Sequence, residues 1–213
     1  MKIVFFGDSI TDMSRVRNSD GKVESYGDGY VFFVAGKLLS ENPQKYEIIN
    51  RGISGNRIVD LYARVKGDVW NQQPDVLSIL IGVNDVWHEL SENPNGVDLT
   101  RWEKMYRMLI EDTKERLPNT KIMILEPFVL RGTKTDYDNR YETFVKVKDY
   151  AAKAKEIARD YGLTFVPLQE KFDEAAEKFG GEYYLYDGVH PDVAGAALIA
   201  SEWLKAFEGI KEE

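Results

Sequence analysis

The sequence contains no cysteine, only two histidines and no long apolar run. Without cysteine the chain forms neither disulfides nor thiolate zinc sites, which agrees with a reducing compartment, so we expect a cytoplasmic protein. The apolar run at 3–6 is shorter than the core of a signal peptide and far shorter than the roughly 18 residues of a membrane helix. We therefore expect neither secretion nor insertion into a membrane.

Acidic residues outnumber basic residues, and the formal net charge is −8. Binding along a nucleic acid relies on clustered Lys and Arg, so this charge argues against a nucleic-acid partner and favours a neutral or cationic ligand. The chain has 213 residues, of which 43% are hydrophobic and 30% charged, which suits one good core better than two. We therefore expect a single domain that spans residues 1–213.

Short apolar segments alternate with longer segments of helical periodicity along the chain. The expected strands span residues 2–6, 46–50, 76–81, 121–125 and 164–167, and the expected helices span about 30–39, 58–69, 100–117, 140–161, 168–179 and from 191 onward. Thr100 and Glu103 form a capping-box pattern at one helix start, and Pro191 suits a first helical turn. Strands joined by helix-length connections predict an α/β fold with a five-stranded parallel sheet between helices.

The first expected strand stops abruptly at Gly7 and is followed by Asp8 and Ser9. Open α/β sheets place their binding crevice at the carboxyl edge, and the first strand is normally central. Glycine lets the chain turn sharply at this point. The pattern favours Ser9 as a nucleophile at a strand end, although this stretch alone would equally fit a helix N-cap.

A carboxylate and an imidazole, Asp187 and His190, lie three positions apart in the run 187–191. His190 can accept the Ser9 proton, while Asp187, ionised at its usual pKa of roughly 4, can hold the imidazole in the required tautomer. The other histidine, His88, has no carboxylate in a recognisable block beside it. We therefore prefer His190 as the base.

Two further strand ends supply groups that can stabilise an oxyanion. Gly52 opens a glycine-bracketed turn at 51–56 after the second strand, and Asn84 follows the third strand. Parallel strands end at one edge, and acyl transfer needs donors aimed at the oxygen that becomes negative. We therefore expect an oxyanion hole made of the N–H groups of Ser9 and Gly52 and the side-chain amide of Asn84.

Two other arrangements use the same regions of the sequence. Asp8, Asp12, Asp85, Asp187 and His190 are the kinds of ligand that a hard metal takes, although we expect no metal and no cofactor. The glycine turns also suit a non-catalytic module that binds a phosphate or a sugar at helix N-termini. Such a module has no need for a carboxylate and an imidazole at this spacing, so a hydrolase is preferred.

Four separated blocks of the chain resemble the SGNH hydrolases, also called the GDSL family. The blocks are Gly7-Asp8-Ser9-Ile10-Thr11, Asn50-Arg51-Gly52, Gly82-Val83-Asn84-Asp85 and Asp187-Gly188-Val189-His190-Pro191. The resemblance implies a flavodoxin-like three-layer α/β/α sandwich. It also implies catalytic roles for Ser9, Asp187 and His190, with Ser9, Gly52 and Asn84 in the oxyanion hole. The serine is not in the Gly-x-Ser-x-Gly elbow of α/β-hydrolases, because position 11 is Thr.

Within this family, the segments 29–31, 50–56 and 81–87 are most similar to bacterial intracellular acetylxylan esterases. The resemblance implies a serine esterase that removes acetyl groups from xylo-oligosaccharides, hence a small acylated substrate. It also implies a homo-oligomer, which the composition neither requires nor excludes. Thioesterases and lysophospholipases belong to the same family and remain alternatives.

The loops at 12–28, 86–98 and 126–138 are expected to set the substrate, with 126–138 as a wall of its site. Three aromatic residues, Tyr26, Trp87 and Tyr186, are candidate platforms for stacking a sugar ring. Packing in the core is the commoner fate of such rings. The sequence therefore predicts the reaction more firmly than the substrate.

Overall fold

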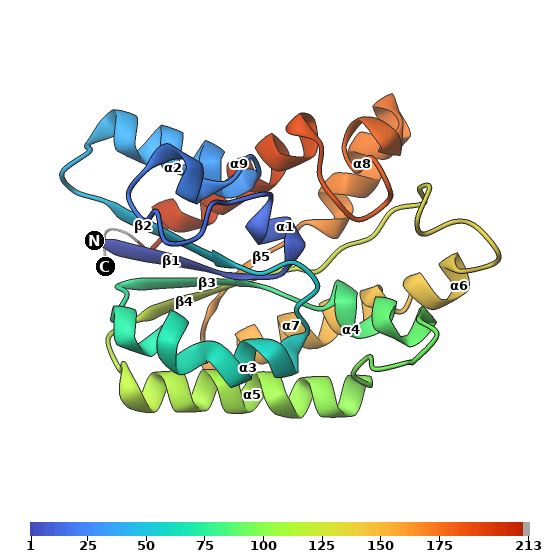
Figure 1. Cartoon of the computed structure of the whole chain (residues 1–213), viewed down its shortest axis with the longest axis horizontal. Helices are drawn as coiled ribbons and strands as arrows, with labels where there is room; N and C mark the ends of the chain where they lie inside the picture. The colour runs from blue at the N-terminus through green and yellow to red at the C-terminus, as the bar shows by residue number, and fades with distance from the viewer. Residues whose placement is uncertain (211–213) are drawn as a thin grey trace.

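The five strands form one parallel sheet in the order β2-β1-β3-β4-β5. The computed structural model describes residues 1–210, so the last three residues of the predicted domain lie outside the described part. The strands are β1 (Lys2–Gly7), β2 (Glu47–Gly52), β3 (Val76–Leu80), β4 (Lys121–Leu125) and β5 (Thr164–Val166). All pairings are parallel, so the strands end at the same edge of the sheet, on the right in Figure 1. The predicted five-stranded parallel sheet is confirmed.

Helices cover both faces of the sheet and make three layers (Figure 1). One face carries α2 (Tyr30–Glu41), α8 (Gln169–Phe179) and α9 (Val193–Glu208), and the other carries α3 (Ile58–Asp68), α5 (Leu99–Arg116) and α7 (Val147–Tyr161). Short helices lie toward the carboxyl edge, namely α1 (Ser9–Asp12), α4 (Val83–Trp87) and α6 (Tyr141–Phe144). Short 3-10 turns span Val23–Tyr26, Trp70–Gln72, His88–Leu90 and Gly181–Tyr183. The predicted α/β/α sandwich is therefore confirmed.

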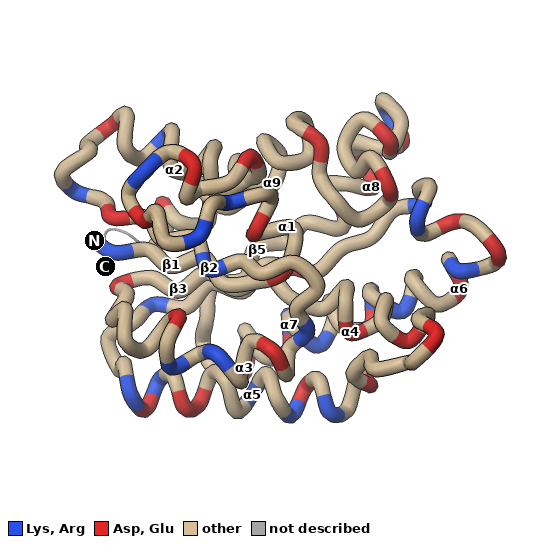
Figure 2. Tube along the Cα trace, viewed as in Figure 1, with Lys and Arg blue, Asp and Glu red and all other residues tan. Residues whose placement is uncertain are grey.

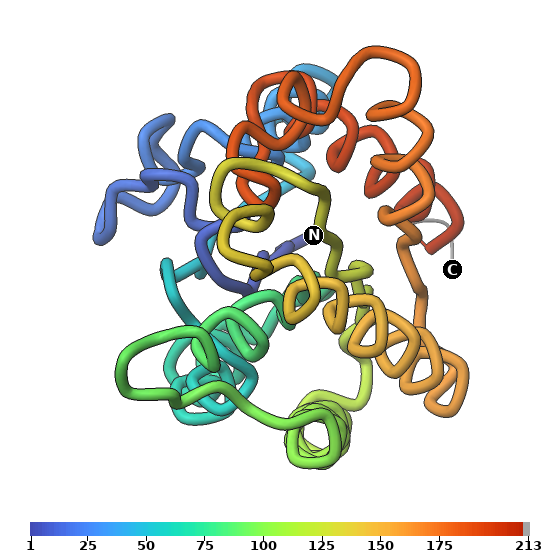
Figure 3. Tube along the Cα trace, turned by 90° about the vertical axis from the view of Figure 1, so that its right-hand side faces the viewer, coloured from blue at the N-terminus to red at the C-terminus, as the bar shows by residue number. Residues whose placement is uncertain are grey.

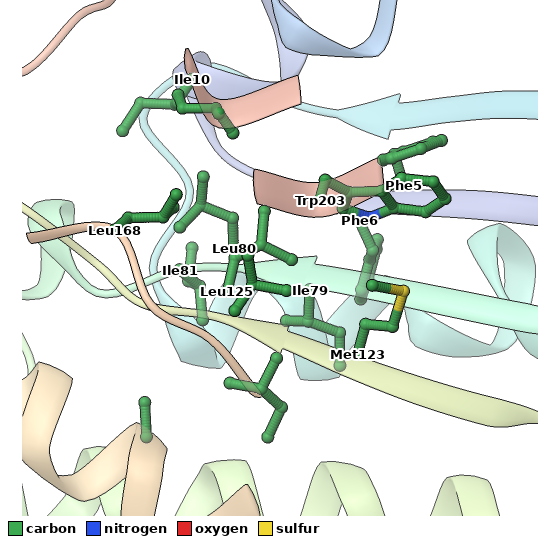
Figure 4. Close-up of a cluster of buried hydrophobic side chains, with 14 of the residues drawn as sticks. Phe5, Phe6, Ile10, Ile79, Leu80, Ile81, Met123, Leu125, Leu168 and Trp203 are labelled. Atoms are coloured by element: carbon green, nitrogen blue, oxygen red, sulfur yellow. The ribbon is translucent and has the colours of Figure 1, made fainter. Parts of the chain in front are cut away.

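The central strands are buried on both faces, which explains their continuous apolar runs. Phe5 and Phe6 of β1 and Ile79 of β3 have no exposed surface. Phe5 packs against Trp203 of α9 (Figure 4). The indole N–H of Trp203 donates to Ser78 Oγ at 2.9 Å. Burial of one such apolar side chain contributes about 1.5–3 kcal/mol to stability. This cluster therefore holds rigid the strands whose ends carry the candidate site.

The start of α5 and the course of the predicted helix at 140–161 both differ from expectation. Asp98 caps α5, because its carboxylate accepts the Arg101 N–H at 3.1 Å, and the predicted cap Thr100 lies inside the helix. An aspartate is a strong N-cap, and its charge also suits the positive end of the helix dipole. The helix at 140–161 is interrupted between α6 and α7. Both predictions were therefore wrong in detail.

The last helix begins later than its proline suggests. Pro191 pairs with Leu185 in an isolated bridge, and Asp192 caps α9, which starts at Val193. Because the bridge ties position 191 down, His190 belongs to an anchored turn before the helix. The predicted place of Pro191 in the first helical turn was wrong.

Basic and acidic residues are interspersed along the outer helices (Figure 2). On α5, for example, Arg107 bonds Glu103 at 3.0 Å and Asp160 of α7 at 2.8 Å. Within the described residues, none of the helices combines the length and the apolar character that crossing a bilayer requires.

Candidate active site

Ser9 occupies the first position of α1, directly after the carboxyl end of β1. Asp8 caps this helix, because its Oδ1 accepts the Ile10 N–H at 2.9 Å. The turn requires glycine at position 7, since a Cβ on Gly7 would lie 2.4 Å from Thr11 Oγ1. The capping role thus falls to Asp8, and the Ser9 hydroxyl is left for another partner.

That partner is the imidazole of His190, which joins Ser9 to Asp187. Nε2 of His190 lies 2.8 Å from Ser9 Oγ, and Nδ1 lies 2.7 Å from Asp187 Oδ2. The other carboxylate oxygen of Asp187 accepts the N–H groups of Val189, at 2.9 Å, and of His190, at 2.8 Å. Because both carboxylate oxygens are engaged, the imidazole is held with Nε2 toward Ser9. The structure brings together the three residues that the sequence analysis selected.

The carboxylate of Asp187 is favoured in its ionised form. Burial on its own would raise the pKa of Asp187, but hydrogen bonds from His190 and from the Val189 N–H outweigh it, and the pKa lies below its usual value. An ionised carboxylate beside Nδ1 favours the tautomer with its proton on that nitrogen. Nε2 is then free to accept the proton of Ser9.

The segment after β4 supports the turn that carries Asp187. The N–H of Leu130 donates to the Gly188 carbonyl at 2.9 Å, and the N–H of Lys134 donates to the Asp187 carbonyl at 3.0 Å. Gly188 has φ +97°, in the left-handed region that favours glycine. Figure 3 faces the carboxyl edge of the sheet and shows this segment, in yellow, lying across it. The segment 126–138, which was predicted to be a wall of the substrate site, therefore holds the Asp187 turn in place, and none of its described residues lines the cavity beside Ser9.

Two N–H groups at the neighbouring ends of β1 and β3 are available for hydrogen bonding. The Ser9 N–H, in the first turn of α1, donates to none of the described residues. Asn84, which is 5% exposed, donates one amide hydrogen to the Asn56 carbonyl at 3.1 Å and keeps the other. Both groups remain candidates for the oxyanion hole.

The predicted third donor, Gly52, is already engaged. Its N–H donates to Asn50 Oδ1 at 2.8 Å in a buried hydrogen bond, and the amide of Asn50 is itself fixed on the Thr11 carbonyl at 2.7 Å. Gly52 also packs against α1, since a Cβ there would lie 2.2 Å from the backbone nitrogen of Asp12. The expected oxyanion role of Gly52 is therefore corrected: this glycine permits close packing, and its N–H is not free.

A second glycine in the same turn has the free N–H that Gly52 lacks. Gly55 lies in the turn 53–56 with φ +81°, and its N–H donates to none of the described residues. Ser54, its neighbour, lines the same cavity as Ser9. The two glycines bracket one turn in the sequence, and they differ in their N–H groups because that of Gly52 donates to the Asn50 side chain and that of Gly55 does not.

A cavity of about 610 Å³ opens beside Ser9 and His190. Its lining includes the side chains of Asp12, Asp192 and Tyr186. Carboxylates accept hydrogen bonds from hydroxyl groups and repel negative charge. The lining therefore suits a neutral, hydroxyl-rich substrate better than an anionic one.

The three candidate stacking residues lie in different surroundings. Tyr186 is 52% exposed, lines the cavity and stacks on His190, with ring centroids 5.8 Å apart. The Trp87 ring is partly buried, and its centroid lies 5.9 Å from the centroid of the His190 ring. Tyr26 lines a separate hollow with Tyr46. The structure places Trp87 and Tyr186 at His190 and does not bring Tyr26 to this cavity, so Tyr26 is withdrawn as a platform.

The alternative base and the alternative metal site are not assembled. His88 lies in a 3-10 turn, where its carbonyl accepts the Asn95 N–H at 3.3 Å, and none of its described contacts reaches Ser9. Within residues 1–210, no three His, Asp or Glu side chains form a group that could hold a metal ion. The described geometry thus favours His190 as the partner of Ser9.

Two buried carboxyl groups next to the site, Asp8 and Asp85, each have one oxygen without a described partner. They are 1% and 0% exposed, and the Oδ2 atom of each is unpaired. Burial raises the pKa of Asp8 to about 7 and raises that of Asp85 well above its usual value. The residue that caps the Ser9 helix therefore titrates near neutral pH.

An α/β sandwich that links a serine, a histidine and an aspartate by hydrogen bonds at its strand ends is typical of serine-dependent acyl hydrolases. The model of the GDSL-like lipase/acylhydrolase family matches residues 5–198. The chain belongs to this family and is a carboxylic ester hydrolase, and the resemblance seen in the sequence is confirmed.

Known relatives cover nearly the whole chain. An acetylxylan esterase from Geobacillus stearothermophilus is 35% identical in an alignment of 217 residues, and this alignment covers 99% of this chain and 96% of the relative. A catalytic mutant of the acetylxylan esterase Axe2 from that organism has a structure with TM-score 0.86 and 34% identity, covering 96% of this chain and 93% of the other. A structure described as that of a GDSL-like lipase from Parabacteroides merdae has TM-score 0.90 and 42% identity, covering 97% of this chain and 95% of the other.

Proposed function

We propose that this esterase removes acetyl groups from acetylated carbohydrate of the xylo-oligosaccharide type, by a Ser-His-Asp acyl-enzyme mechanism. The observation that carries the proposal is the hydrogen-bonded chain from Ser9 through His190 to Asp187, with distances of 2.8 and 2.7 Å, beside a cavity. Further support comes from Axe2, the acetylxylan esterase of Geobacillus, whose catalytic mutants change a serine, an aspartate and a histidine.

The first half of the reaction transfers the acetyl group to the enzyme. Ser9 Oγ attacks the acetyl carbonyl carbon while His190 Nε2 takes the hydroxyl proton. Asp187 stabilises the resulting imidazolium and does not take the proton itself. The bond to the sugar oxygen then breaks, His190 returns the proton to that oxygen, and the acetyl group remains on Ser9 as an ester.

The second half of the reaction releases acetate. A water molecule attacks the acetyl carbonyl while His190 Nε2 accepts one of its protons. When the bond to Ser9 Oγ breaks, His190 gives this proton to Ser9 and restores the hydroxyl. One ester and one water are thereby converted into one alcohol and one carboxylic acid, which ionises to acetate.

The negative oxygen of each tetrahedral intermediate needs donors that are already in place. We assign this role to the N–H groups of Ser9 and Gly55 and to the free amide hydrogen of Asn84. In serine proteases, the loss of one such donor costs about 2.7–4 kcal/mol of transition-state stabilisation. In this arrangement, Gly52 contributes by allowing β2 and α1 to approach each other.

The choice of a sugar ester over a lipid or coenzyme A ester rests on the cavity. Asp12 and Asp192 line it beside Ser9. Their carboxylates can bond to sugar hydroxyls, and they disfavour the phosphate groups that phospholipids and coenzyme A carry. Tyr186 offers an exposed aromatic face at the same place.

The decisive experiment measures release of acetate from acetylated xylo-oligosaccharides beside hydrolysis of p-nitrophenyl esters from acetyl to octanoyl and of acyl-thioesters. We expect fast deacetylation of the sugar and a steep loss of activity beyond the acetyl ester. Activity that rises with acyl length, or that is confined to thioesters, would favour a lysophospholipase or a thioesterase. Absence of any hydrolysis would favour a non-catalytic sugar- or phosphate-binding module.

Three further expectations complete the proposal. We propose that residues 1–213 act as one domain, since the described part has a single sheet with helices on both faces. A homo-oligomer and a cytoplasmic location stay predictions. Size-exclusion chromatography with light scattering tests the former, and cell fractionation tests the latter.

A further inference from the structure

The guanidinium of Arg64, on α3, bonds the ends of two strands and the turn 53–56. Nη2 donates to the Gly7 carbonyl at 3.0 Å, Nη1 donates to the Arg51 carbonyl at 2.8 Å, and Nε donates to Asn56 Oδ1 at 2.7 Å. Gly7 lies two positions before Ser9, and Asn56 directly follows Gly55. One side chain thus connects the backbone leading to the nucleophile with the turn that carries a proposed oxyanion donor.

The same connection continues to the third strand end. The Asn56 carbonyl accepts the side-chain amide of Asn84 at 3.1 Å, so Asn56 is bonded to Arg64 by its side chain and to Asn84 by its backbone. On the other side of the turn, the Ser54 N–H donates to Asp12 Oδ2 at 2.9 Å. The position of the turn relative to Ser9 therefore depends on a few defined hydrogen bonds.

The geometry of Arg64 uses the whole guanidinium. The side chain is 17% exposed, pairs with Asp68 one turn later and lies over the Phe6 ring, 4.4 Å from its centroid. A planar guanidinium offers donors in fixed directions, whereas a lysine ammonium is a compact point charge. Lysine at this position could keep the charge, but its three donors share one nitrogen and cannot replace the three separate nitrogens, Nε, Nη1 and Nη2, that each contact a different acceptor.

We propose that Arg64 is a positioning residue for ester hydrolysis, which sets the distance between Ser9 and the oxyanion donors by bonding Gly7 and Asn56 at once. The inference rests on the proposed function and adds a residue that does not touch the substrate. Donors that act on the oxyanion matter in the transition state, so their displacement lowers kcat and leaves KM nearly unchanged.

The first test compares Arg64→Lys and Arg64→Gln with wild type on p-nitrophenyl acetate. We expect kcat to fall about 10- to 100-fold, because a displacement of about 1 Å has effects of this size, and KM to stay within about threefold. In Arg64→Ala, added guanidinium at non-denaturing concentration should restore part of kcat. A structural role alone would lower the melting temperature without this kinetic signature or rescue.

Arg107 provides the matched control. It is also a half-buried helix arginine with carboxylate partners, at Glu103 and Asp160, and none of its described contacts includes a residue of the site. Arg107→Gln should lower the melting temperature and leave kcat within about twofold of wild type. If wild type is active and both Arg64 variants keep its kcat, the inference is wrong and the proposed function stands. If wild type hydrolyses no ester, both the inference and the proposed function are wrong.

A second variant keeps the inference testable if Arg64 variants do not fold. Asn56→Ala removes the acceptor of the Arg64 Nε and keeps the backbone carbonyl that holds Asn84, so kcat should fall with little change in KM. In an Arg64→Lys background, Asn56→Ala should lower log kcat by less than half of the amount by which it lowers log kcat in wild type. The reason is that the effects of substitutions in one hydrogen-bond network are not additive. Unchanged kcat in Asn56→Ala, or full additivity, would contradict the inference.

Discussion

Nε2 of His190 lies 2.8 Å from Ser9 Oγ, although the two residues are 181 positions apart in the chain. The contact follows from the topology, because β1 lies between β2 and β3 in the sheet and delivers Ser9 to the edge that the turn before α9 also reaches. In the proposed mechanism, this contact gives Ser9 the role of nucleophile and His190 the role of base, and substitutions test the parts of this arrangement separately.

Replacement of the proposed nucleophile is the first prediction. Ser9→Ala should lower kcat for p-nitrophenyl acetate by about ten thousand-fold or more, as loss of a nucleophile does in other serine enzymes. An organophosphonate should label wild type once per chain and should not label the variant, as mass spectrometry would show. Ser54→Ala, which changes another serine of the same cavity, should stay active and be labelled. An active Ser9→Ala enzyme would falsify the mechanism.

The second prediction concerns the orientation of the imidazole. Asp187→Asn should lower kcat by up to about ten thousand-fold, because an amide beside Nδ1 favours the wrong tautomer. The pKa of Asp187 lies below its usual value, so the wild-type carboxylate stays ionised across neutral pH and the loss should persist throughout a pH–rate profile from 6 to 9. Activity near the wild-type level at any pH in this range would show that Asp187 does not orient His190.

The third prediction separates binding from catalysis. Asn84→Ala should lower kcat about 100- to 1000-fold with little change in KM, since an oxyanion donor acts mainly in the transition state. Steady-state kinetics on p-nitrophenyl acetate gives both constants. The variant also loses the bond to the Asn56 carbonyl, so thermal unfolding must show that it is folded at the assay temperature. A rise in KM at constant kcat would assign Asn84 to substrate binding.

Much of this arrangement could be predicted because it depends on local patterns and on the topology of parallel sheets. The apolar runs identified the strands, and helix-length connections implied a shared carboxyl edge. That edge was enough to place Ser9 and Asn84 on the same side of the sheet, and the short spacing of Asp187 and His190 indicated their contact. That β1 and β3 are neighbours is a finding of the structure.

The details that the sequence did not predict depend on individual side-chain bonds. Gly52 and Gly55 bracket the same turn, and the choice between them depends on Asn50, whose side chain turns back onto the Gly52 N–H. Tyr26 was grouped with the stacking residues by its type, but the 12–28 loop carries it to another hollow. The role of Arg64 was equally hidden, because its acceptors are backbone carbonyls that carry no sequence signature.

The fourth prediction tests the packing role assigned to Gly52. A Cβ at this position would lie 2.2 Å from the Asp12 backbone nitrogen, so Gly52→Ala must displace α1 or β2. We expect a loss of about 1–3 kcal/mol or more in unfolding free energy by urea denaturation, as for overpacking of a core. Gly67→Ala on α3 is the control, because a Cβ there meets nothing within 4 Å. It should stabilise by about 0.5–1 kcal/mol, and a stable, fully active Gly52→Ala would contradict the packing role.

The fifth prediction uses the buried carboxyl group that caps the Ser9 helix. Asp8 is 1% exposed, and burial, only partly offset by the Ile10 N–H, raises its pKa from 3.8 to about 7. A group whose pKa is raised by folding stabilises the protein fully below its unfolded pKa, and this contribution is lost as the pH rises through the folded pKa. Asn is nearly isosteric with the protonated acid and does not titrate.

We therefore expect wild type to lose stability relative to Asp8→Asn as the pH rises. The unfolding free energy of wild type minus that of Asp8→Asn should decrease between pH 4 and pH 8, by up to about 4 kcal/mol. Urea denaturation at intervals of pH measures this difference directly. Asp20→Asn is the control, because its hydrogen bonds with Arg51 place the pKa of Asp20 below its usual value. The unfolding free energy of wild type minus that of Asp20→Asn should stay constant above pH 5 and decrease only at acid pH. A difference for Asp8 that is also constant from pH 5 to pH 8 would mean that its carboxylate is ionised throughout, and that its Oδ2 has a partner, such as a bound water, that stabilises the charge.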